Sequence, residues 1–330
     1  MDLTAFASTY GTDEACRAHM ESLRWPGGPV CPGCGSVNNA VPVSTKPGRW
    51  RCRACNRQFN VLLGTALEGT HLPLRVWYLA MYLMLSTAKP ISAMSLHRQL
   101  GIQYRTCWHL LHRLRAMLAS GEKLPLSGII EADGTYVGGK PENLPKGAPR
   151  PGKRGRGTTK PMLFAAIERG GEARTVAVPS ASVAAIAPAP WGWTRGAATL
   201  MTDELGAYRW PDAERQSGIG RKMEAYHRVN HSQREYARTT PGGLRAHVNT
   251  AEGFFSLFKR GIFGIATASL PRRHHQVSPK HLHRYVRRTS PFDAAGHEFR
   301  YNGRKHDATE RIACCLIGRH GRLRLRELFA

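Results

Sequence analysis

Two Cys-x-x-Cys pairs near the start of the chain constrain its fold more than any other feature. Cys31 and Cys34 form the first pair, Cys52 and Cys55 form the second, and seventeen residues separate the pairs. Each pair can hold one ion with two thiolates, and together they close a tetrahedral zinc site without an open position. We therefore predict a structural zinc ribbon rather than a redox pair or a chance cluster. The other cysteines lack matching partners and are expected to lie outside this site: Cys16, Cys107, Cys314 and Cys315.

The chain is strongly basic. Its 330 residues include 48 Lys and Arg against 23 Asp and Glu, a formal net charge of +25. This length favours two or more domains, and this charge calls for a polyanionic partner, most commonly nucleic acid and less often an anionic membrane surface. The longest apolar stretch, Val76 to Leu85, is too short to span a bilayer, and the N-terminus lacks a basic signal-peptide start. We expect a soluble cytoplasmic protein that binds double-stranded DNA and no membrane.

The first third of the chain carries candidate DNA contacts. Residues 12–24 are predicted to form a short amphipathic helix that leads into the zinc ribbon. Within the ribbon, Arg53 and Arg57 lie beside the second cysteine pair, among aromatic residues. Basic, aromatic ribbons of this type commonly touch DNA.

A helix-turn-helix is predicted after a further apolar helix at residues 74–87. Ile91–Leu100 and Tyr104–Leu118 have helical patterns, and a short turn that contains Gly101 joins them. Apolar side chains would pack the two helices together, while basic side chains of the second helix are expected to face outward, toward DNA: Arg105, Arg113 and Arg115. An ordinary helical linker is the alternative, because helix pairs with a glycine turn are common.

From Gly128 onward the chain contains short runs typical of β-strands. Four strands are predicted, and the turn at Arg169–Glu172 should make a hairpin of the middle two: Ile129–Ala132, Met162–Ile167, Thr175–Val178 and Ala198–Thr202. Between the first two strands lies a Gly- and Pro-rich basic segment, Pro145–Lys160. It is expected to be a mobile loop that contacts DNA through Lys153, Arg154 and Arg156.

Two of these strands end in an aspartate. Asp133 follows the first strand, and Asp203 follows the fourth. Carboxylates at the tips of adjacent strands would bring oxygen ligands together and could hold Mg²⁺ or Mn²⁺ beside a phosphodiester. Taken singly, Asp133 could start a turn and Asp203 could cap a helix. The combination is what indicates a metal-dependent nuclease.

A predicted helix at His247–Arg260 supplies a third acid. Asn249, Glu252, Ser256 and Lys259 form one polar stripe of this helix, opposite its apolar residues. Glu252 could complete the metal site, and Lys259, two turns later on the same face, could hold a DNA phosphate. The alternative is a capping box, in which Asn249 caps the helix and Glu252 reaches back to the cap. For Asn249, a capping role is as well supported as a functional role. For Glu252, a capping role is less well supported.

Longer motifs surround these candidate residues. Leu23-Arg24-Trp25-Pro26 precedes the cysteine pairs, Asp133 begins Asp133-Gly134-Thr135-Tyr136-Val137-Gly138-Gly139, and Glu252 lies in Asn249-Thr250-Ala251-Glu252-Gly253. Together with Thr202-Asp203, their order and spacing resemble the zinc-ribbon-bearing DDE transposases of bacterial insertion sequences, the ISXO2-like transposase family. The resemblance runs from about Thr12 to Gly264.

This resemblance implies a ribonuclease-H-like α/β core: a five-stranded mixed sheet flanked by helices, with Asp133 and Asp203 on neighbouring strands. It implies that both aspartates and a third residue bind divalent metal, where the third is Glu252 or, as in some members, Asn249. It also implies a homo-oligomer that acts on terminal inverted repeats and target DNA. Two departures stand out, because Gly134 replaces the usual acid after the first aspartate and the segment after Gly264 is irregular.

We therefore expect four parts: an N-terminal helix and zinc ribbon (1–70), a helix-turn-helix region (71–122), a catalytic domain (123–290) and a basic C-terminal tail (291–330). The predicted function is that of an insertion-sequence transposase, which hydrolyses DNA phosphodiesters with metal ions and transfers strands. One alternative is a decayed copy that only binds DNA sequence-specifically. A second is a structure-selective nuclease without strand transfer.

Overall fold

The computed structural model describes residues 1–87, 91–118, 125–137, 162–178, 181–186, 193, 199–205, 208, 225–268 and 294–317. Contacts divide the chain into two compact units, one formed by Met1–Gly121 with Gly303–Ala330 and the other by Glu122–Asn302. Among the helices within those ranges, none is both long and apolar enough to cross a membrane. The basic segment with Lys153, Arg154 and Arg156 lies outside the described residues.

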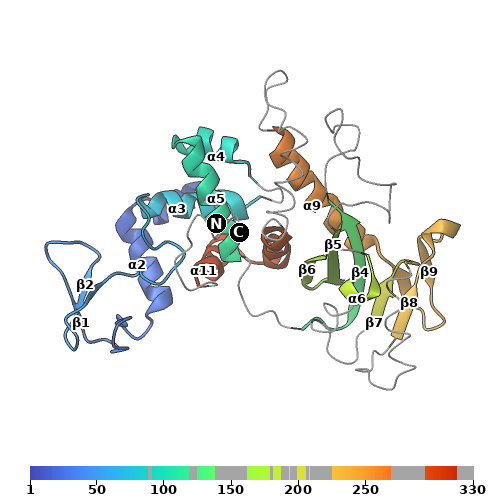
Figure 1. Ribbon diagram of the computed structural model, residues 1–330, viewed down its shortest axis with the longest axis horizontal. Helices are drawn as coiled ribbons and strands as arrows, with labels where there is room; N and C mark the ends of the chain where they lie inside the picture. The colour runs from blue at the N-terminus through green and yellow to red at the C-terminus, as the bar shows by residue number, and fades with distance from the viewer. Residues whose placement is uncertain are drawn as a thin grey trace. The chain divides into compact units, whose positions relative to one another are not determined.

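The first unit contains a small antiparallel sheet and several helices (Figure 1). The sheet has the strand order β1-β2-β3 and belongs to the zinc ribbon that the cysteine spacing predicted. The elements of this unit are α1 (Leu3–Thr9), α2 (Asp13–Arg24), β1 (Ala40–Pro42), β2 (Trp50–Cys52), β3 (Gln58–Phe59), α3 (Leu74–Leu85), α4 (Ala93–Leu100), α5 (Tyr104–Leu118), η5 (Gly303–Lys305) and α11 (Ala308–Ile317).

The predicted helix at residues 12–24 is confirmed as α2. The hydroxyl of Thr12 caps it by accepting a hydrogen bond from the amide of Ala15 at 3.1 Å. Helix α1 was not expected, because its seven residues carry little periodic signal. It is held by Phe6, which is buried and stacks on Tyr82 of α3 with 4.5 Å between the ring centroids.

Helices α4 and α5 confirm the predicted pair and its turn. The hydroxyl of Ser92 accepts a hydrogen bond from the amide of Ser95 at 3.0 Å and so starts α4. Gly101 ends it with φ of +67°, a backbone conformation that glycine adopts without steric cost. Buried leucines join the two helices: Leu96, Leu110, Leu111 and Leu114.

The expected outward orientation of the α5 arginines is correct for Arg105 and wrong for two others. Arg105 is exposed. Arg113 instead donates hydrogen bonds to the carbonyls of Ala66 and Glu68 and lies 4.9 Å over the ring of Trp77. Arg115 is only 5% exposed. Charge made both arginines look like DNA contacts, whereas local carbonyl acceptors and an aromatic face draw Arg113 inward.

The segment expected as a basic tail contains packed helices. Residues 294–302 are helical and belong to the second unit, whereas α11 belongs to the first unit and contacts α2, α3 and α5. Arg311 of α11 donates a hydrogen bond of 2.5 Å to the carbonyl of Leu85 at the end of α3. The first unit is thus assembled from two distant stretches of the chain.

The second unit is built on a five-stranded mixed sheet with the order β6-β5-β4-β7-β8. The β4–β5 and β5–β6 pairs are antiparallel, which confirms the predicted hairpin, while β4–β7 and β7–β8 are parallel. A separate two-stranded ribbon, β9-β10, leads into α9. The elements are β4 (Ile129–Tyr136), β5 (Met162–Glu168), β6 (Ala173–Val178), α6 (Val183–Ile186), β7 (Thr199–Thr202), β8 (Ala225–Arg228), η4 (His231–Gln233), β9 (Ala237–Thr239), β10 (Arg245–His247) and α9 (Asn249–Ala268).

Helices cover both faces of this sheet. On one face, Ile130 and Ala132 of β4 pack in a core cluster with Ile186 of α6. On the other, the phenylalanines of α9 pack against β5 and the helix at 294–302: Phe254, Phe255 and Phe258. Figure 1 shows α9 running beside β4 and β5. This arrangement agrees with the ribonuclease-H-like core that was expected.

Candidate active site

Asp133 lies on the face of β4 that α9 covers. Successive side chains of a strand point to opposite faces, and Ile130 and Ala132 lie on the α6 side. Glu131 and Asp133 therefore point toward α9. One Asp133 oxygen, Oδ1, accepts a hydrogen bond of 2.7 Å from the amide of Gly134.

Asp203 comes from the neighbouring parallel strand. Glu131 of β4 is paired with Met201 of β7, so two residues further along both strands Asp133 is level with Asp203. Met201 packs in a core cluster with Val248, the residue before α9, which places Asp203 on the α9 side as well. Asp203 Oδ1 also accepts a 2.9 Å hydrogen bond from the amide of Leu205.

Glu252 reaches the same region from the first turn of α9. Its side chain is 52% exposed, and its Oε1 lies 3.8 Å from Nδ1 of His231 in η4. The polar stripe predicted for this helix is exposed at Asn249, Glu252 and Ser256 and partly exposed at Lys259, while Phe255 and Phe258 are buried. The helical periodicity thus identified the correct outer face.

The electrostatics of Asp133 show that Asp203 and Glu252 act on it. Burial raises the pKa of Asp133 to about 7, and repulsion by the carboxylates of Asp203 and Glu252 contributes to this rise. The amide of Gly134 and the nearby His231 act in the opposite direction. A divalent cation bound beside Asp133 would stabilise the charged form of this carboxylate.

The donor set at this position fits a hard cation such as Mg²⁺ or Mn²⁺, because it offers carboxylate oxygens from a strand pair and a facing helix. The three carboxylates do not converge as tightly as a closed metal site does. Within the described part of the chain, the four ribbon cysteines are the only ligand group close enough together to hold an ion. A metal ion held by these separated carboxylates would have coordination positions left for oxygen atoms of DNA.

The alternative of a capping box on α9 is not what the structure shows. The amide of Glu252 donates to the carbonyl of Val248, so Val248 occupies the cap position and Asn249 is the first helical residue. The amides of Thr250 and Ala251 donate to Glu131 of β4, not to Asn249. The Glu252 side chain instead lies beside His231 and influences the pKa of Asp133.

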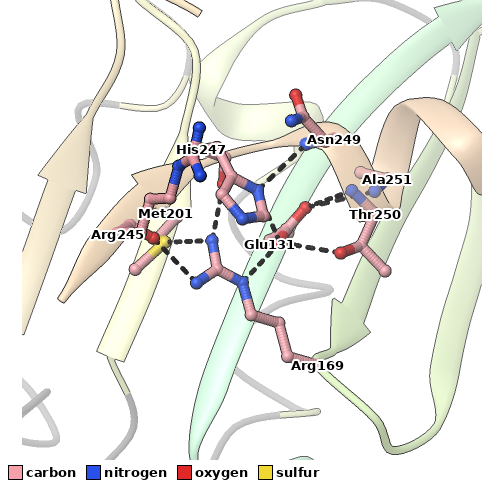
Figure 2. Close-up of polar contacts among 8 residues, drawn as sticks. All are labelled: Glu131, Arg169, Met201, Arg245, His247, Asn249, Thr250 and Ala251. Carbon is pink, nitrogen blue, oxygen red and sulfur yellow. Dashed lines mark hydrogen bonds and ion pairs between the residues drawn. The ribbon is translucent and has the colours of Figure 1, made fainter. Parts of the chain in front are cut away.

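Glu131 is the residue that sequence reasoning missed. It is wholly buried, and its carboxylate accepts hydrogen bonds from Arg169 Nε at 2.6 Å and from the amide and hydroxyl of Thr250 at 2.7 and 2.9 Å (Figure 2). A lone acid inside an apolar strand, two residues before a candidate ligand, was the available signal. Its partners lie 38 and 119 residues away, beyond any local pattern.

Gly134 departs from the family pattern without opening the acid cluster. It lies on the α6 side of β4, opposite to Asp133, by the alternation of the strand. A Cβ atom there would lie 1.8 Å from Cε of Met162 and 2.9 Å from the hydroxyl of Tyr208. Met162 and Tyr208 thus fill the space that the usual acid would need.

The zinc ribbon brings all four predicted ligands together. Their sulfur atoms lie within 4.8 Å of one another, and the Cys31–Cys55 and Cys34–Cys52 pairs are 3.5 and 3.6 Å apart. Tetrahedral zinc with sulfur at about 2.3 Å places sulfurs about 3.8 Å apart, so these thiols fit zinc. The other four cysteines lie outside this group, as expected. Arg53 and Arg57 are exposed beside it.

Comparisons with known proteins agree with this geometry. The ISXO2-like transposase domain matches residues 125–290, which contain Asp133, Asp203 and Glu252. The chain belongs to the ISXO2-like transposase family. The transposase zinc-ribbon domain matches residues 11–58, which contain the four cysteines.

One curated protein that is similar to this chain comes from a transposable element. An uncharacterized protein in transposable element ISH50 of Halobacterium salinarum is 28% identical over 264 residues, which is 76% of this chain and 84% of the relative. The family match and this relative support a transposase role, and the zinc-ribbon match together with the four-cysteine cluster supports structural Zn²⁺.

Proposed function

We propose that this transposase is catalytically active: it binds the terminal inverted repeats of its element, hydrolyses a phosphodiester there, and transfers the freed end to target DNA. The observation that supports the proposal is that Asp133 lies in β4, Asp203 directly follows the adjacent parallel strand β7, and the charges of Asp203 and of Glu252 on α9 both raise the pKa of Asp133. This reaction is proposed to take place in the cytoplasm.

In this proposal the three acids hold divalent ions, Mg²⁺ or Mn²⁺, at the scissile phosphate. Bound ions would supply positive charge to the attacking and leaving oxygens of an in-line displacement. Water attacks the phosphorus, the bond to the 3′ oxygen breaks, and a 3′-hydroxyl is released. That hydroxyl then attacks a target phosphodiester, which forms one P–O bond and breaks another. Asn249 is the second choice for the third acid's role, since it is exposed on the same helical turn.

Lys259 is proposed to bind a DNA phosphate. It lies seven residues after Glu252, about two helical turns, on the same partly exposed face of α9. An ammonium at that position could hold the strand while the carboxylates act on the scissile bond.

The zinc ribbon and the α4–α5 pair are proposed to recognise the element end. Exposed arginines support this role: Arg53 and Arg57 in the ribbon, and Arg105 in the first turn of α5. The basic segment with Lys153, Arg154 and Arg156 is proposed to contact the DNA backbone, and its positive charge is the ground for this proposal. A helix-turn-helix function, the division of residues 1–290 into ribbon, helix-turn-helix and catalytic parts, and a homo-oligomer on paired ends belong to the same proposal.

The test is Mg²⁺-dependent cleavage and joining of a labelled element-end duplex by the purified full chain, with Asp203→Asn alongside. Joined product that Asp203→Asn abolishes would support the transposase reaction. Cleavage without joining would favour the structure-selective nuclease. Binding without cleavage would favour a decayed copy that only binds DNA, the reading for which the departure at Gly134 gives some ground.

A further inference from the structure

We propose that Glu131 is a positioning residue that fixes the first turn of α9 on β4, so that Glu252 faces Asp133. The inference rests on the proposed function, because it assigns Glu131 a part in building that site. Glu131 itself is wholly buried and its oxygens are occupied by protein donors, so it acts through other residues.

The residue at the N-terminal cap position of α9 does not cap the helix with its side chain. Val248 occupies the cap position, and its side chain cannot accept a hydrogen bond. Glu131 supplies the acceptor instead, at 2.7 Å from the amide of Thr250 and 3.3 Å from that of Ala251. A carboxylate at the N-terminus of a helix also interacts favourably with the helix dipole. A residue of β4 therefore caps the helix that carries Glu252.

Several segments of the chain meet at the Glu131 carboxylate. Arg169, which follows β5, donates from Nε to Glu131 and from Nη1 and Nη2 to the carbonyls of Arg245 and His247 in β10 (Figure 2). Nδ1 of His247 lies 3.2 Å from Oε1 of Glu131. The network joins β4, the β5–β6 turn, β10 and α9, so it fixes the entry of the chain into the helix.

Only a short stretch of backbone separates Glu131, or the residue bound to it, from each of the acids Asp133 and Glu252. Asp133 is two residues along the same strand and on the same face, about 7 Å away at the usual strand rise. Glu252 is two residues after Thr250, whose amide and hydroxyl both bind Glu131. Rigid backbone on both sides means that a shift of this carboxylate would change the separation of Asp133 and Glu252.

A double-mutant cycle on Mn²⁺ affinity separates positioning from plain stabilisation. The affinity of the full chain is measured by electron paramagnetic resonance for Glu131→Gln, Glu252→Gln and the double variant. We expect Glu131→Gln to weaken Mn²⁺ binding about 10- to 100-fold, as supporting residues of metal sites do. In the Glu252→Gln background, the same change should have an effect of less than about twofold, because its route to the site is already lost. Multiplying effects would overturn the proposal.

Glu298→Gln is the matched control. Glu298 is a buried acid of the same unit that accepts hydrogen bonds from the amide and hydroxyl of Thr175 at 2.8 and 2.7 Å. Its partner lies on β6, which β5 separates from β4, the strand that carries Glu131. Loss of this acid should lower stability and leave Mn²⁺ affinity unchanged. Equal weakening of Mn²⁺ binding by both variants would reduce Glu131 to a structural residue.

Thr250→Val keeps the inference testable if Glu131→Gln fails to fold. It removes the hydroxyl donor to Glu131 while the buried charge and its other partners remain. A several-fold loss of Mn²⁺ affinity is expected, again absent in the Glu252→Gln background. Unchanged affinity would contradict the proposal.

Hydrogen exchange distinguishes failure of this inference from failure of the proposed function. If the wild-type chain binds no Mn²⁺, the proposed metal chemistry is wrong, yet the anchoring of α9 can still be measured. The Thr250 and Ala251 amides should then exchange at least tenfold faster in Glu131→Gln than in Glu298→Gln. Equal exchange in the two variants would show that Glu131 does not hold the helix.

Discussion

Nδ1 of His231 lies 3.8 Å from Oε1 of Glu252, and the other ring nitrogen of His231 is buried with no hydrogen-bond partner among the residues that the structure describes. The imidazole also lowers the pKa of Asp133. A histidine between two candidate metal ligands can orient a carboxylate or accept a ligand itself.

The first prediction is that His231→Ala slows cleavage of element-end DNA about 10- to 100-fold, because Glu252 loses the group beside it. The rate is measured with excess enzyme on a labelled duplex. His306→Ala is the control, since His306 pairs with Glu310 at 2.9 Å on the exposed surface of α11's unit. Equal losses in the two variants would contradict a specific role for His231.

The second prediction concerns pH in the absence of metal. Burial, with repulsion by Asp203 and Glu252, raises the pKa of Asp133 from 3.8 to about 7. Between these values the folded chain holds a proton that the unfolded chain has released, so raising the pH lowers the free energy of unfolding. The decline is measured by urea unfolding without added divalent ions from pH 5 to pH 8, as the free energy of unfolding of the wild-type chain minus that of Asp133→Asn. The subtraction cancels other titrating groups, such as His112 and His297, whose pKa values burial lowers to about 3.

Two additions sharpen that experiment. Asp133→Asn is the reference because its side chain cannot ionise, so its stability should lack the contribution that falls with rising pH. Mg²⁺ at pH 8 should restore stability to the wild-type chain and not to the variant, because the ion stabilises the charged acids only when they are intact. An unchanged slope in Asp133→Asn would mean that another group titrates.

The third prediction is that Cys34→Ser removes zinc and unfolds the ribbon, since metal binding contributes folding free energy to such modules. Elemental analysis should find about one zinc per wild-type chain and much less in the variant, with weaker binding of element-end DNA. Cys314→Ser is the matched control because Cys314 is also an exposed cysteine but is not a ligand. Loss of zinc from both variants would refute the four-cysteine assignment.

The fourth prediction separates two arginines of α5. Arg105→Ala should weaken DNA binding and reduce its salt dependence by about one counterion, because the exposed side chain can contact a phosphate. Arg115→Ala should instead lower the free energy of unfolding, by about 2 kcal/mol, since the side chain is buried. Binding as a function of salt and unfolding in urea measure the two effects. A salt-dependence change in Arg115→Ala alone would reverse the assignment.

Sequence reasoning succeeded where the signal was local or periodic. The cysteine spacing predicted the ribbon, Thr12 and Gly101 marked helix ends, and the apolar runs located four strands of the sheet. Helical periodicity also predicted the exposed side of α9 at Glu252. These features depend on neighbours within a few residues, which a sequence displays directly.

What escaped prediction depends on contacts between distant residues. Strand β8 was missed because Ala225–Arg228 is short and partly exposed throughout, so it lacks a buried pattern. The inward turn of Arg113 depends on the carbonyl of Ala66, and the role of Glu131 depends on Thr250. Charge and strand character alone do not show which partner the fold brings to such a residue.

The division of the first unit between two stretches of chain has a consequence during synthesis. Helix α11, which contacts α2, α3 and α5, leaves the ribosome only after the whole of Glu122–Asn302. The sheet unit can therefore complete its fold while the ribbon and helical unit still lacks one of its helices. The unit that carries the three acids would therefore fold before the unit proposed to recognise DNA is complete. A nascent chain halted between the two stages would have the acids in place and would lack part of its proposed DNA-recognition unit.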